Sequence, residues 1–312
     1  MVRLVHWYKA FDSEIRAKNW RELKYWVRGK YWDWREFRTP SPIFVVGCSR
    51  AGTTVTYETL AASDELASFG FELPQLWHSL WGPKHNNFES EAAGAEHARP
   101  EHREYVLRYF YQRLGTGRIL EKSCINVMRI PYLCRLFPDA HFVYIQRDGR
   151  DNVSSLIDGW RLQDHFALDR YLGTLPDPVH INGGEFRTWR FFLPPGWRKL
   201  NNASLEEVCA YQWIKANEFA LAGAANIPEN QWHRVRYEEF FENPAEVFAN
   251  LYDGLGLQFT SKARGRCNTL YNYQTSIISS PPKREKWRYR NRASVERILG
   301  HIGPMQKRLG YD

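Results

Sequence analysis

IFVVGCSRAGTT, residues 43–54, is the stretch that decides how this chain folds. Its first residues are apolar and rich in β-branched side chains, and they lie between Pro42 and a glycine-rich turn, as in a buried parallel strand. A helix is expected directly afterwards, over residues 53–63. The N–H groups of such a turn and of the first helical turn point at one spot, and the helix dipole adds partial positive charge there. The stretch therefore predicts an anion site at the end of a parallel strand.

The turn has the spacing of a nucleotide-binding P-loop between Gly47 and Gly52, but Thr53 stands where such loops carry lysine. Arg50, inside the turn, supplies a cation in its place, and a planar guanidinium can bind two oxygens of a phosphate or sulfate. No acidic Mg²⁺ ligand ends the later apolar strand, which leads into Arg147. The turn therefore indicates a phosphate or sulfate site without the lysine and metal of an NTPase. The alternative is a tight strand–helix turn that binds no ligand.

A second motif, HFVYIQRDGRDNVSS (residues 141–155), places an arginine at the end of another apolar strand. Ligands of open α/β sheets bind at the carboxyl ends of the strands, so Arg147 is expected to face the same edge as the first turn. Ser155 lies eight residues later, about two turns into the next helix. An arginine and a serine placed in this way can bind a second phosphate. The alternative is a surface ion-pair network of Arg147, Asp148, Arg150 and Asp151.

Apolar strands alternate with helical patterns over most of the chain. This predicts an α/β fold, a single P-loop-like domain over residues 39–312 with a central parallel sheet flanked by helices. The expected strands are 43–47, 67–71, 118–122, 141–146 and 232–237. The expected helices are 53–63, 101–114, 127–136, 150–158, 204–222 and 244–254, with a C-terminal helix that ends near Gly303-Pro304.

Two segments lie outside this alternation. Residues 1–38 are expected to form a partly helical, aromatic and basic arm, because residues 1–40 hold ten Lys/Arg against five Asp/Glu, with five Trp among them. Residues 161–203 combine several Gly and Pro with aromatic residues, and loops of this length in a compact domain are often lids or binding segments. We expect both segments to shape a ligand pocket with aromatic walls. The arm is also a candidate surface for docking on a membrane or for forming a homo-oligomer, although its sequence shows no clear amphipathic stripe.

The net charge of +8 favours anionic ligands, nucleic acid or an anionic membrane surface, although basic runs are also common on solvated faces.

No run of about 18 apolar residues is present, so no transmembrane helix is expected, and the N-terminus lacks the apolar region of a secretory signal. The five cysteines are scattered and form no C-x-x-C pair, which favours neither a disulfide framework nor a zinc site. The pattern predicts a cytoplasmic protein without a metal centre.

In the order of its motifs the chain resembles the sulfotransferases that use 3′-phosphoadenosine 5′-phosphosulfate (PAPS). FVVGCSRAGTT looks like the family's 5′-phosphosulfate loop, and FPDAHFVYIQRDGRDNVSSL looks like its 3′-phosphate motif. RILEKS (118–123), RYEEFFENP (236–244), KREKWR (283–288) and the ending MQKRLGYD resemble further segments of the bacterial and tyrosylprotein-type members. The resemblance spans residues 42–312. It departs at EKSCIN, which lacks a proline that often follows EKS, and the glycine-rich C-terminal loop of the cytosolic animal enzymes is missing.

This resemblance implies a binding site for PAPS, with adenosine 3′,5′-bisphosphate as the product and no metal. The first loop would bind the 5′-phosphosulfate, the second motif the 3′-phosphate, and Tyr237 would contact the adenine. The implied donor-binding residues are Ser49, Arg50, Ala51, Gly52, Thr53, Thr54, Arg147, Ser155, Tyr237, Lys286 and Trp287. Tyr237 and Trp287 also fit the alternative of core aromatics, and Lys286 also fits that of a solvated lysine.

Sulfuryl transfer resembles phosphoryl transfer, an in-line displacement that depends on positioning and on positive charge at the leaving oxygen. Arg50 is the first candidate for that charge, and Lys122, at the end of its own expected strand, is the second. By resemblance to the tyrosylprotein type, Glu72 is the matching catalytic base, with a pKa that its apolar neighbours are expected to raise. His78 is the competing base, because imidazole titrates near neutral pH. An ordinary surface role for Glu72 is the third alternative.

The resemblance implies a soluble bacterial enzyme of specialised metabolism that transfers a sulfuryl group from PAPS to a hydroxyl or amine of a small-molecule natural product. Two other function classes fit parts of the sequence. Interleaved Lys/Arg and Trp residues also fit a nucleic-acid-binding protein. The P-loop-like turn also fits a nucleotide kinase, although a kinase needs Mg²⁺ and the lysine that Thr53 replaces. We expect no nucleic-acid partner and no stable membrane insertion.

Overall fold

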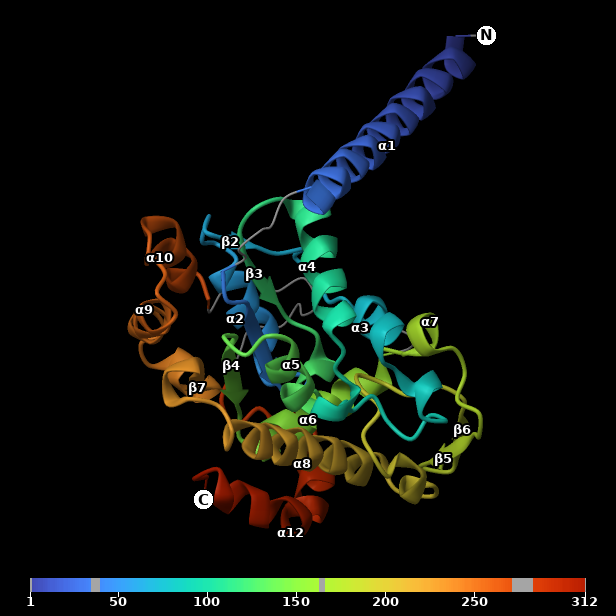
Figure 1. Cartoon of the computed structure of the whole chain (residues 1–312). Helices are drawn as coiled ribbons and strands as arrows, with labels where there is room; N and C mark the ends of the chain where they lie inside the picture. Colours follow the sequence, from blue (N-terminus) through green and yellow to red (C-terminus); the bar gives the residue numbers. More distant parts are fainter. Residues whose placement is uncertain (1, 35–39, 163–165, 271–282, 312) are drawn as a thin grey trace.

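A computed structural model describes residues 2–34, 40–162, 166–270 and 283–311. Residues 35–39, at the end of the expected arm, and residues 163–165, inside the expected lid, lie outside the described residues. Figure 1 shows an α/β body from which one long helix projects.

A parallel sheet lies at the centre of the body. Its strands are β1 (Ile43–Gly47), β2 (Leu66–Ala67), β3 (Arg118–Glu121), β4 (His141–Gln146) and β7 (Trp232–Arg236). Within the described residues the sheet has five strands, all parallel, in the order β2-β3-β1-β4-β7. β1 is buried along its whole length, and its register with β4 runs from Ile43 opposite His141 to Gly47 opposite Ile145. This register brings the carboxyl ends of β1 and β4 side by side.

Helices flank the sheet in two groups (Figure 1). In one group α2 (Thr53–Leu60) packs on β1 and contacts α10 (Ser261–Asn268), which in turn contacts α9 (Pro244–Gly254). In the other, α6 (Gly149–Arg161), α8 (Leu205–Ala224) and α12 (Arg292–Arg308) pack together, and α8 also contacts β1. The remaining elements are α1 (Val2–Trp34), α3 (Pro74–Leu80), α4 (Pro100–Leu114), α5 (Ile130–Leu136), α7 (Asp169–Leu172), α11 (Trp287–Arg290), the hairpin β5 (Val179–Ile181) and β6 (Gly184–Phe186), and the 3₁₀ helices η1 (Pro83–His85), η2 (Ala95–His97), η3 (Cys124–Met128), η4 (Trp197–Leu200), η5 (Glu229–Gln231) and η6 (Tyr237–Phe241).

The fold class is as predicted, but several element boundaries were wrong. The helix expected over 53–63 ends at Leu60. The strand expected over 67–71 is shorter, because β2 covers Leu66–Ala67 only. The helix expected over 127–136 is divided at Arg129 between η3 and α5. Pro131 favours this division, because proline is tolerated in the first turn of a helix but not in its interior.

The C-terminal helix was expected to end near Gly303-Pro304, and this was also wrong. α12 continues through Pro304 to Arg308. Its buried face runs on past the proline through Met305, and Leu309 directly after the helix is 1% exposed. Burial of this apolar face favours continuation of the helix, against the roughly 3 kcal/mol that an internal proline costs.

The segment expected to act as a lid, residues 161–203, contains α7, the β5–β6 hairpin and η4. Its large aromatic side chains mostly build the core instead of pocket walls. Trp189 and Phe192 are 0% exposed and Trp197 is 1% exposed. Burial of these rings holds the segment against the rest of the body.

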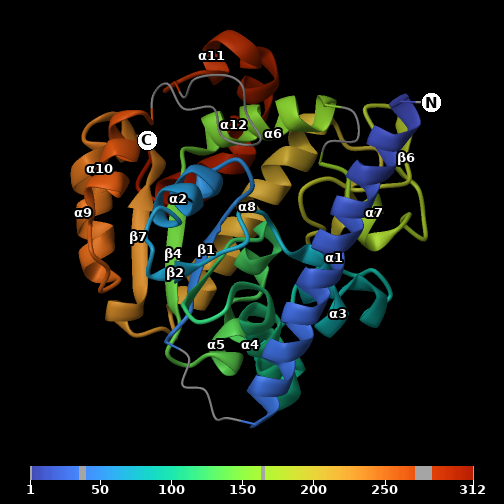
Figure 2. The same cartoon turned by 90° about the horizontal axis from the view of Figure 1, so that it is seen from above.

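The expected arm is one continuous helix, α1. Its C-terminal part packs on α4, where Arg28 donates to the backbone oxygens of Gln112 and Arg113 at 3.3 and 3.2 Å and the buried Trp32 donates to Glu104. Its N-terminal end extends away from the body (Figure 1), and from above α1 passes over α4, α3 and α7 (Figure 2). Within the described residues, no helix, α1 included, is long and apolar enough to cross a bilayer.

Candidate active site

The turn after β1 has an unusual backbone. Gly47 and Gly52 have φ angles of 154° and 107°, and Arg50 has φ 70°, in the left-handed region that non-glycine residues rarely adopt. A Cβ on Gly47 would lie 2.7 Å from the backbone oxygen of Ile145, so glycine is required where β1 leaves the sheet beside β4. Gly52 then caps α2, whose first N–H groups have no partner inside the helix. Ala51 and Thr53, also expected to bind the donor, are buried in the same turn.

Direct contacts join the two sequence motifs. Arg147 Nη1 donates to the backbone oxygen of Arg50 at 2.6 Å, and Arg50 Nε donates to Ser155 Oγ at 3.3 Å. Asn152 Nδ2 donates to the backbone oxygen of Ser49 at 2.9 Å. The end of β4 and the first turns of α6 are therefore fixed against the turn after β1. Arg50, Arg147 and Ser155 meet at one edge of the sheet, as the sequence predicted.

This edge concentrates buried positive charge. Arg147 is 8% exposed, and burial together with the Arg147 charge lowers the pKa of Arg50 to about 10. Burial and nearby cations, Arg290 foremost and then Arg147 and Arg50, also lower the pKa of Lys286. Among the described residues, Ser49 Oγ and Arg147 Nε are buried without a hydrogen-bond partner. These groups fit an anion with several oxygens, because such an anion would neutralise the charge and accept the missing hydrogen bonds.

Tyr237 covers the start of α2. Its ring centroid lies 4.3 Å from the guanidinium carbon of Arg147. A Cβ on Gly52 would lie 2.4 Å from Cδ2 of the same ring. Tyr237 begins η6 directly after β7, the neighbour of β4 in the sheet. The ring therefore borders the edge where the two anion-binding motifs meet.

A carboxylate and an ammonium group lie at the end of β3, on the other side of β1. Lys122 Nζ is 2.5 Å from Glu72 Oε1 and donates to Thr54 Oγ1 at 3.0 Å. The Lys122 side chain is 3% exposed, whereas that of Glu72 is 27% exposed. Because Thr54 belongs to the first turn of α2, Lys122 connects Glu72 to the anion-binding turn.

The pKa of Glu72 is lowered, which corrects the expectation that its apolar neighbours raise it. Burial alone would raise this pKa, but the charge of Lys122 and hydrogen bonds from Cys124 outweigh that effect. Cys124 donates its backbone N–H at 3.0 Å and its thiol at 2.9 Å to Glu72 Oε2. Glu72 is therefore ionised at neutral pH and held in one orientation by partners on both oxygens.

A sequence profile of the sulfotransferase family matches residues 42–175 and 169–261, which together exceed half of the 312 residues. The chain belongs to the sulfotransferase family.

Individual relatives of this sulfotransferase are distant. Protein-tyrosine sulfotransferase 2 of Gallus gallus is 23% identical over 293 residues, which cover 86% of this chain and 69% of the chicken protein. Sulfotransferase STF9 from Mycobacterium avium superposes with a TM-score of 0.54 at 13% identity, covering 88% of this chain and 78% of that one. The sulfotransferase domain from the curacin biosynthetic pathway has a TM-score of 0.49 at 14% identity, covering 86% and 99%. The superposition on STF9 shows a shared α/β fold.

His78, the alternative candidate for the catalytic base, lies in a buried network. His78 Nε2 is 2.6 Å from Glu91 Oε1, and the backbone N–H of Leu193 donates to Glu91 Oε2 at 2.5 Å. Arg129 Nε donates to the backbone oxygen of Glu91 at 2.9 Å. The network ties α3 to the segment around Leu193, so His78 has a structural role that accounts for its position. Glu72, in contrast, contacts Lys122 directly.

The surface ion-pair network considered for the second motif is present only as one pair. Arg150 and Asp148 approach to 2.5 Å. Asp151 instead accepts the backbone N–H groups of Glu285 and Trp287 at 2.8 and 3.1 Å, which attaches the C-terminal segment to α6. Trp287, expected among the donor-binding residues, is 6% exposed and is part of the hydrophobic core.

Two residues of the site were not expected from the sequence. Cys124, which holds Glu72, follows EKS where the family often carries proline, so the departure from the motif was the available signal. Phe166 lies 5.1 Å from the guanidinium of Arg50 and stacks on Phe191 with ring centroids 4.7 Å apart. No pattern in the sequence distinguishes Phe166 from the other aromatic residues of its segment.

Proposed function

We propose that this sulfotransferase transfers the sulfuryl group of PAPS to a hydroxyl or amine of a small-molecule acceptor. The bond between sulfur and the 5′-phosphate oxygen breaks, a bond from sulfur to the acceptor oxygen or nitrogen forms, and the acceptor proton passes to Glu72. The products are adenosine 3′,5′-bisphosphate and the sulfated acceptor. The observation that carries the proposal is the direct linkage of the two anion-binding motifs through Arg147, Arg50 and Ser155.

A donor with two separate anionic groups fits this linkage. The turn after β1 offers the N–H groups of α2 and the hydroxyl of Ser49 to a 5′-phosphosulfate. Arg147 and Ser155 suit a 3′-phosphate, which would replace the hydrogen bond between Arg50 and Ser155 with charge-assisted ones. Tyr237, whose ring lies beside Arg147, would contact the adenine, and Lys286 would add to the positive charge around the phosphates.

Arg50 and Lys122 supply positive charge at the leaving group. Lys122 Nζ reaches Thr54 Oγ1 in the turn, where the phosphosulfate would bind. Negative charge builds on the departing phosphate as its bond to sulfur breaks, and fixed cations in a dry site stabilise that charge. These two side chains would supply the positive charge that a lysine supplies in a P-loop, at the position where this chain has Thr53. We therefore propose a reaction without a metal ion.

Glu72 is proposed as the catalytic base. Its low pKa makes it a weak base, so it is suited to accept the acceptor proton while the new bond to sulfur forms rather than before. Lys122 on one oxygen and Cys124 on the other fix the carboxylate in the orientation needed for that transfer.

Small molecules, natural products included, are the proposed acceptor class. Phe71, next to Glu72, is 62% exposed, and the stacked pair of Phe166 and Phe191 adjoins Arg50. Apolar rings around a polar centre favour an acceptor with an apolar or aromatic body. The name of the chicken relative indicates protein tyrosine as its acceptor, so a tyrosine peptide is the main competing acceptor.

The test is transfer of ³⁵S from labelled PAPS, in EDTA, to a panel of phenols, alcohols, amines and a tyrosine peptide, followed by a metabolite extract. We expect label on at least one small molecule without added metal. Label on the peptide alone would contradict the acceptor class. Absence of transfer, together with a melting temperature that adenosine 3′,5′-bisphosphate does not raise, would contradict the donor.

Assays on the same purified protein distinguish a sulfotransferase from a nucleotide kinase and from a nucleic-acid-binding protein. A kinase would phosphorylate an acceptor with ATP and Mg²⁺ and would be inactive in EDTA. A nucleic-acid-binding protein would show a steep salt dependence of its affinity for DNA or RNA and no response to the bisphosphate.

A further inference from the structure

α1 turns a large apolar face to solvent. Tyr25, Gly29 and Trp32 lie on the side that packs on α4. The opposite side covers an arc of about 160° by the 3.6-residue repeat of the helix. It carries the large apolar residues Ile15, Trp20, Leu23, Trp26, Val27, Tyr31 and Trp34, whose exposed fractions range from 36% to 80%, and the polar residues Arg16, Asn19 and Lys30 fall within the same arc. Soluble monomers rarely expose so many large apolar side chains on one element, so this face is suited to an apolar partner.

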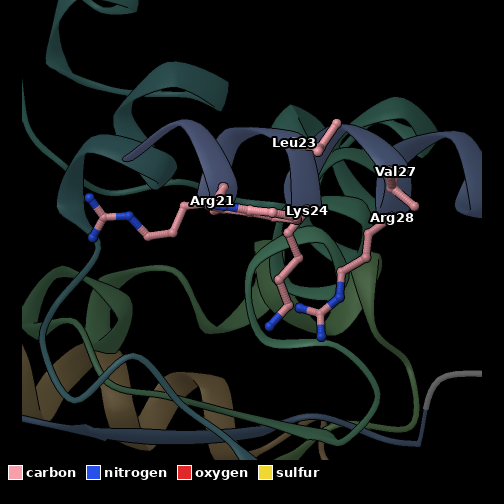
Figure 3. Close-up of a pocket in the computed structure, with 6 residues that line it drawn as sticks. Arg21, Leu23, Lys24, Val27 and Arg28 are labelled. Atoms are coloured by element: carbon pink, nitrogen blue, oxygen red, sulfur yellow. The ribbon is translucent and has the colours of Figure 1, made fainter. Parts of the chain in front are cut away.

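Positive side chains lie both inside this arc and on the other side of α1. By the helical repeat Arg16 and Lys30 fall inside the arc, whereas Arg28 faces α4, to whose backbone it donates. Arg21, Lys24 and Arg28 follow each other at the same spacing as Trp20, Leu23 and Val27, and together these six residues line a surface hollow of about 540 Å³. In Figure 3, Lys24 and Arg28 extend to one side of the helix and Leu23 points to the other. α1 as a whole contains eight Lys/Arg and four Asp/Glu, a net charge of +4.

We propose that α1 is an interfacial helix that attaches the enzyme to the surface of an anionic lipid bilayer. Trp and Tyr combine an apolar ring with a polar N–H or O–H, which suits the boundary between headgroups and acyl chains. Lys and Arg beside them are attracted to anionic headgroups. The helix would lie in the plane of the interface, in agreement with the finding that α1 is not apolar enough to cross a bilayer.

The charge and the exposed apolar side chains of α1 favour an anionic bilayer over a second copy of the chain and over a nucleic acid. A second copy of the chain would place two helices of net charge +4 against each other, which opposes pairing through this face. A nucleic acid would contact the basic side chains but would leave the exposed apolar ones, among them Trp20, Trp26 and Trp34, in water. An anionic bilayer, in contrast, satisfies both the apolar and the basic side chains.

The test is co-sedimentation of the full-length enzyme with vesicles of phosphatidylcholine alone and of phosphatidylcholine with phosphatidylglycerol, at low and high salt. We expect binding to the anionic vesicles only, weakened by salt, with a blue shift of Trp fluorescence. Arg21→Gln with Lys24→Gln should lower the affinity about fivefold for each charge removed. Trp20→Ser with Trp26→Ser should lower it at least about tenfold.

A matched control removes exposed apolar side chains elsewhere. Tyr105→Ser with Leu299→Ser replaces residues that are 47% and 40% exposed on α4 and α12, and it should leave vesicle binding unchanged. Circular dichroism of every variant shows that it is folded. The proposal is overturned by equal binding to neutral vesicles, by the absence of binding, or by binding that the α1 substitutions leave intact. It is also overturned if light scattering shows a dimer that Trp20→Ser with Trp26→Ser dissociates and no vesicle binding is seen.

Discussion

Among single residues, Arg50 joins the parts of the proposed donor site. Its left-handed backbone, φ 70°, is of the kind that costs roughly 1–3 kcal/mol and persists where surrounding contacts enforce it. Arg147 on its backbone oxygen, Ser155 on its Nε and Phe166 under its guanidinium are such contacts. With a pKa of about 10, Arg50 still carries its charge at neutral pH, so the resting site repels cations and attracts an anion.

Glu72→Gln tests the catalytic base. The variant should keep its donor affinity and lose about 100-fold or more in kcat, because glutamine cannot accept the acceptor proton. Steady-state rates at saturating PAPS, with the melting shift produced by adenosine 3′,5′-bisphosphate, separate the two effects. His78→Gln is the control and should keep most of its kcat if properly folded. A near-normal kcat in Glu72→Gln would contradict the assignment of Glu72 as the base.

The buried carboxyl group of Glu121, in the core near Glu72, should make the stability of the protein depend on pH. It is 2% exposed, and burial is the main reason that its pKa is raised to about 7. Ser123 Oγ, Trp77 Nε1 and Asn126 Nδ2 donate to it at 2.5, 3.2 and 2.5 Å. A carboxyl group with a raised pKa binds its proton more tightly in the folded state. Its contribution to the free energy of unfolding is therefore complete below about pH 4.5 and is lost as the pH rises through about 7.

Glu121→Gln should remove this dependence. The difference in unfolding free energy between the wild type and the variant should fall by about 3 kcal/mol between about pH 5 and pH 8. Urea unfolding at several pH values measures it, and the comparison with the variant cancels the contribution of other titrating groups. A difference that stays constant with pH would contradict the raised pKa.

At the scale of elements, the entry into α2 depends on Gly52. Its φ of 107° is strained for any other residue, and a Cβ would lie 2.4 Å from the ring of Tyr237. Gly52→Ala should therefore destabilise the protein by roughly 1–3 kcal/mol and displace Tyr237 from the proposed donor site. Urea unfolding and binding of adenosine 3′,5′-bisphosphate measure the two effects.

The control is Gly265→Ala, inside α10, where no atom lies within 4 Å of the added Cβ. It should leave nucleotide binding unchanged and stabilise the fold by up to about 1 kcal/mol, because alanine favours helix. Equal effects of the two substitutions would show that Gly52 has no special role.

Elements whose ends are set by local sequence signals could be predicted from the sequence. Elements whose ends are set by contacts with distant parts of the chain could not. β4 and α9 have the predicted bounds because an apolar run ends at Gln146 and because Asn243 and Pro244 begin a helix. α12 passes through Pro304 because a buried face, not a local propensity, decides where it ends. Arg50, Arg147 and Ser155 belong to spaced motifs. Cys124 has no such motif. Its contact with Glu72 exists because β2 and β3, which precede these two residues in the chain, are neighbours in the sheet.

At the scale of the whole molecule, α1 is attached to the body by its last turns. Arg28, Trp32 and Asp33 make the hydrogen bonds and ion pair that join it to α4. Deleting residues 1–24 should therefore change the melting temperature by less than about 2 °C, whereas Trp32→Ala should lower it by several degrees. Differential scanning calorimetry tests both. A large destabilisation on deletion would mean that the N-terminal part of α1 contributes to the fold.

The central claim is that the turn carrying Arg50 and the pair of Arg147 and Ser155 bind opposite ends of one doubly phosphorylated adenosine. Titration calorimetry with adenosine 3′,5′-bisphosphate in EDTA tests it most directly. The wild type should bind, Arg147→Ala should bind roughly ten- to 100-fold more weakly, and the exposed-arginine control Arg187→Ala should bind normally. Adenosine 5′-monophosphate, which lacks the 3′-phosphate, should lose little further affinity in Arg147→Ala. Absence of heat with the wild type, or an Arg147→Ala variant that binds the bisphosphate as the wild type does, would contradict the claim.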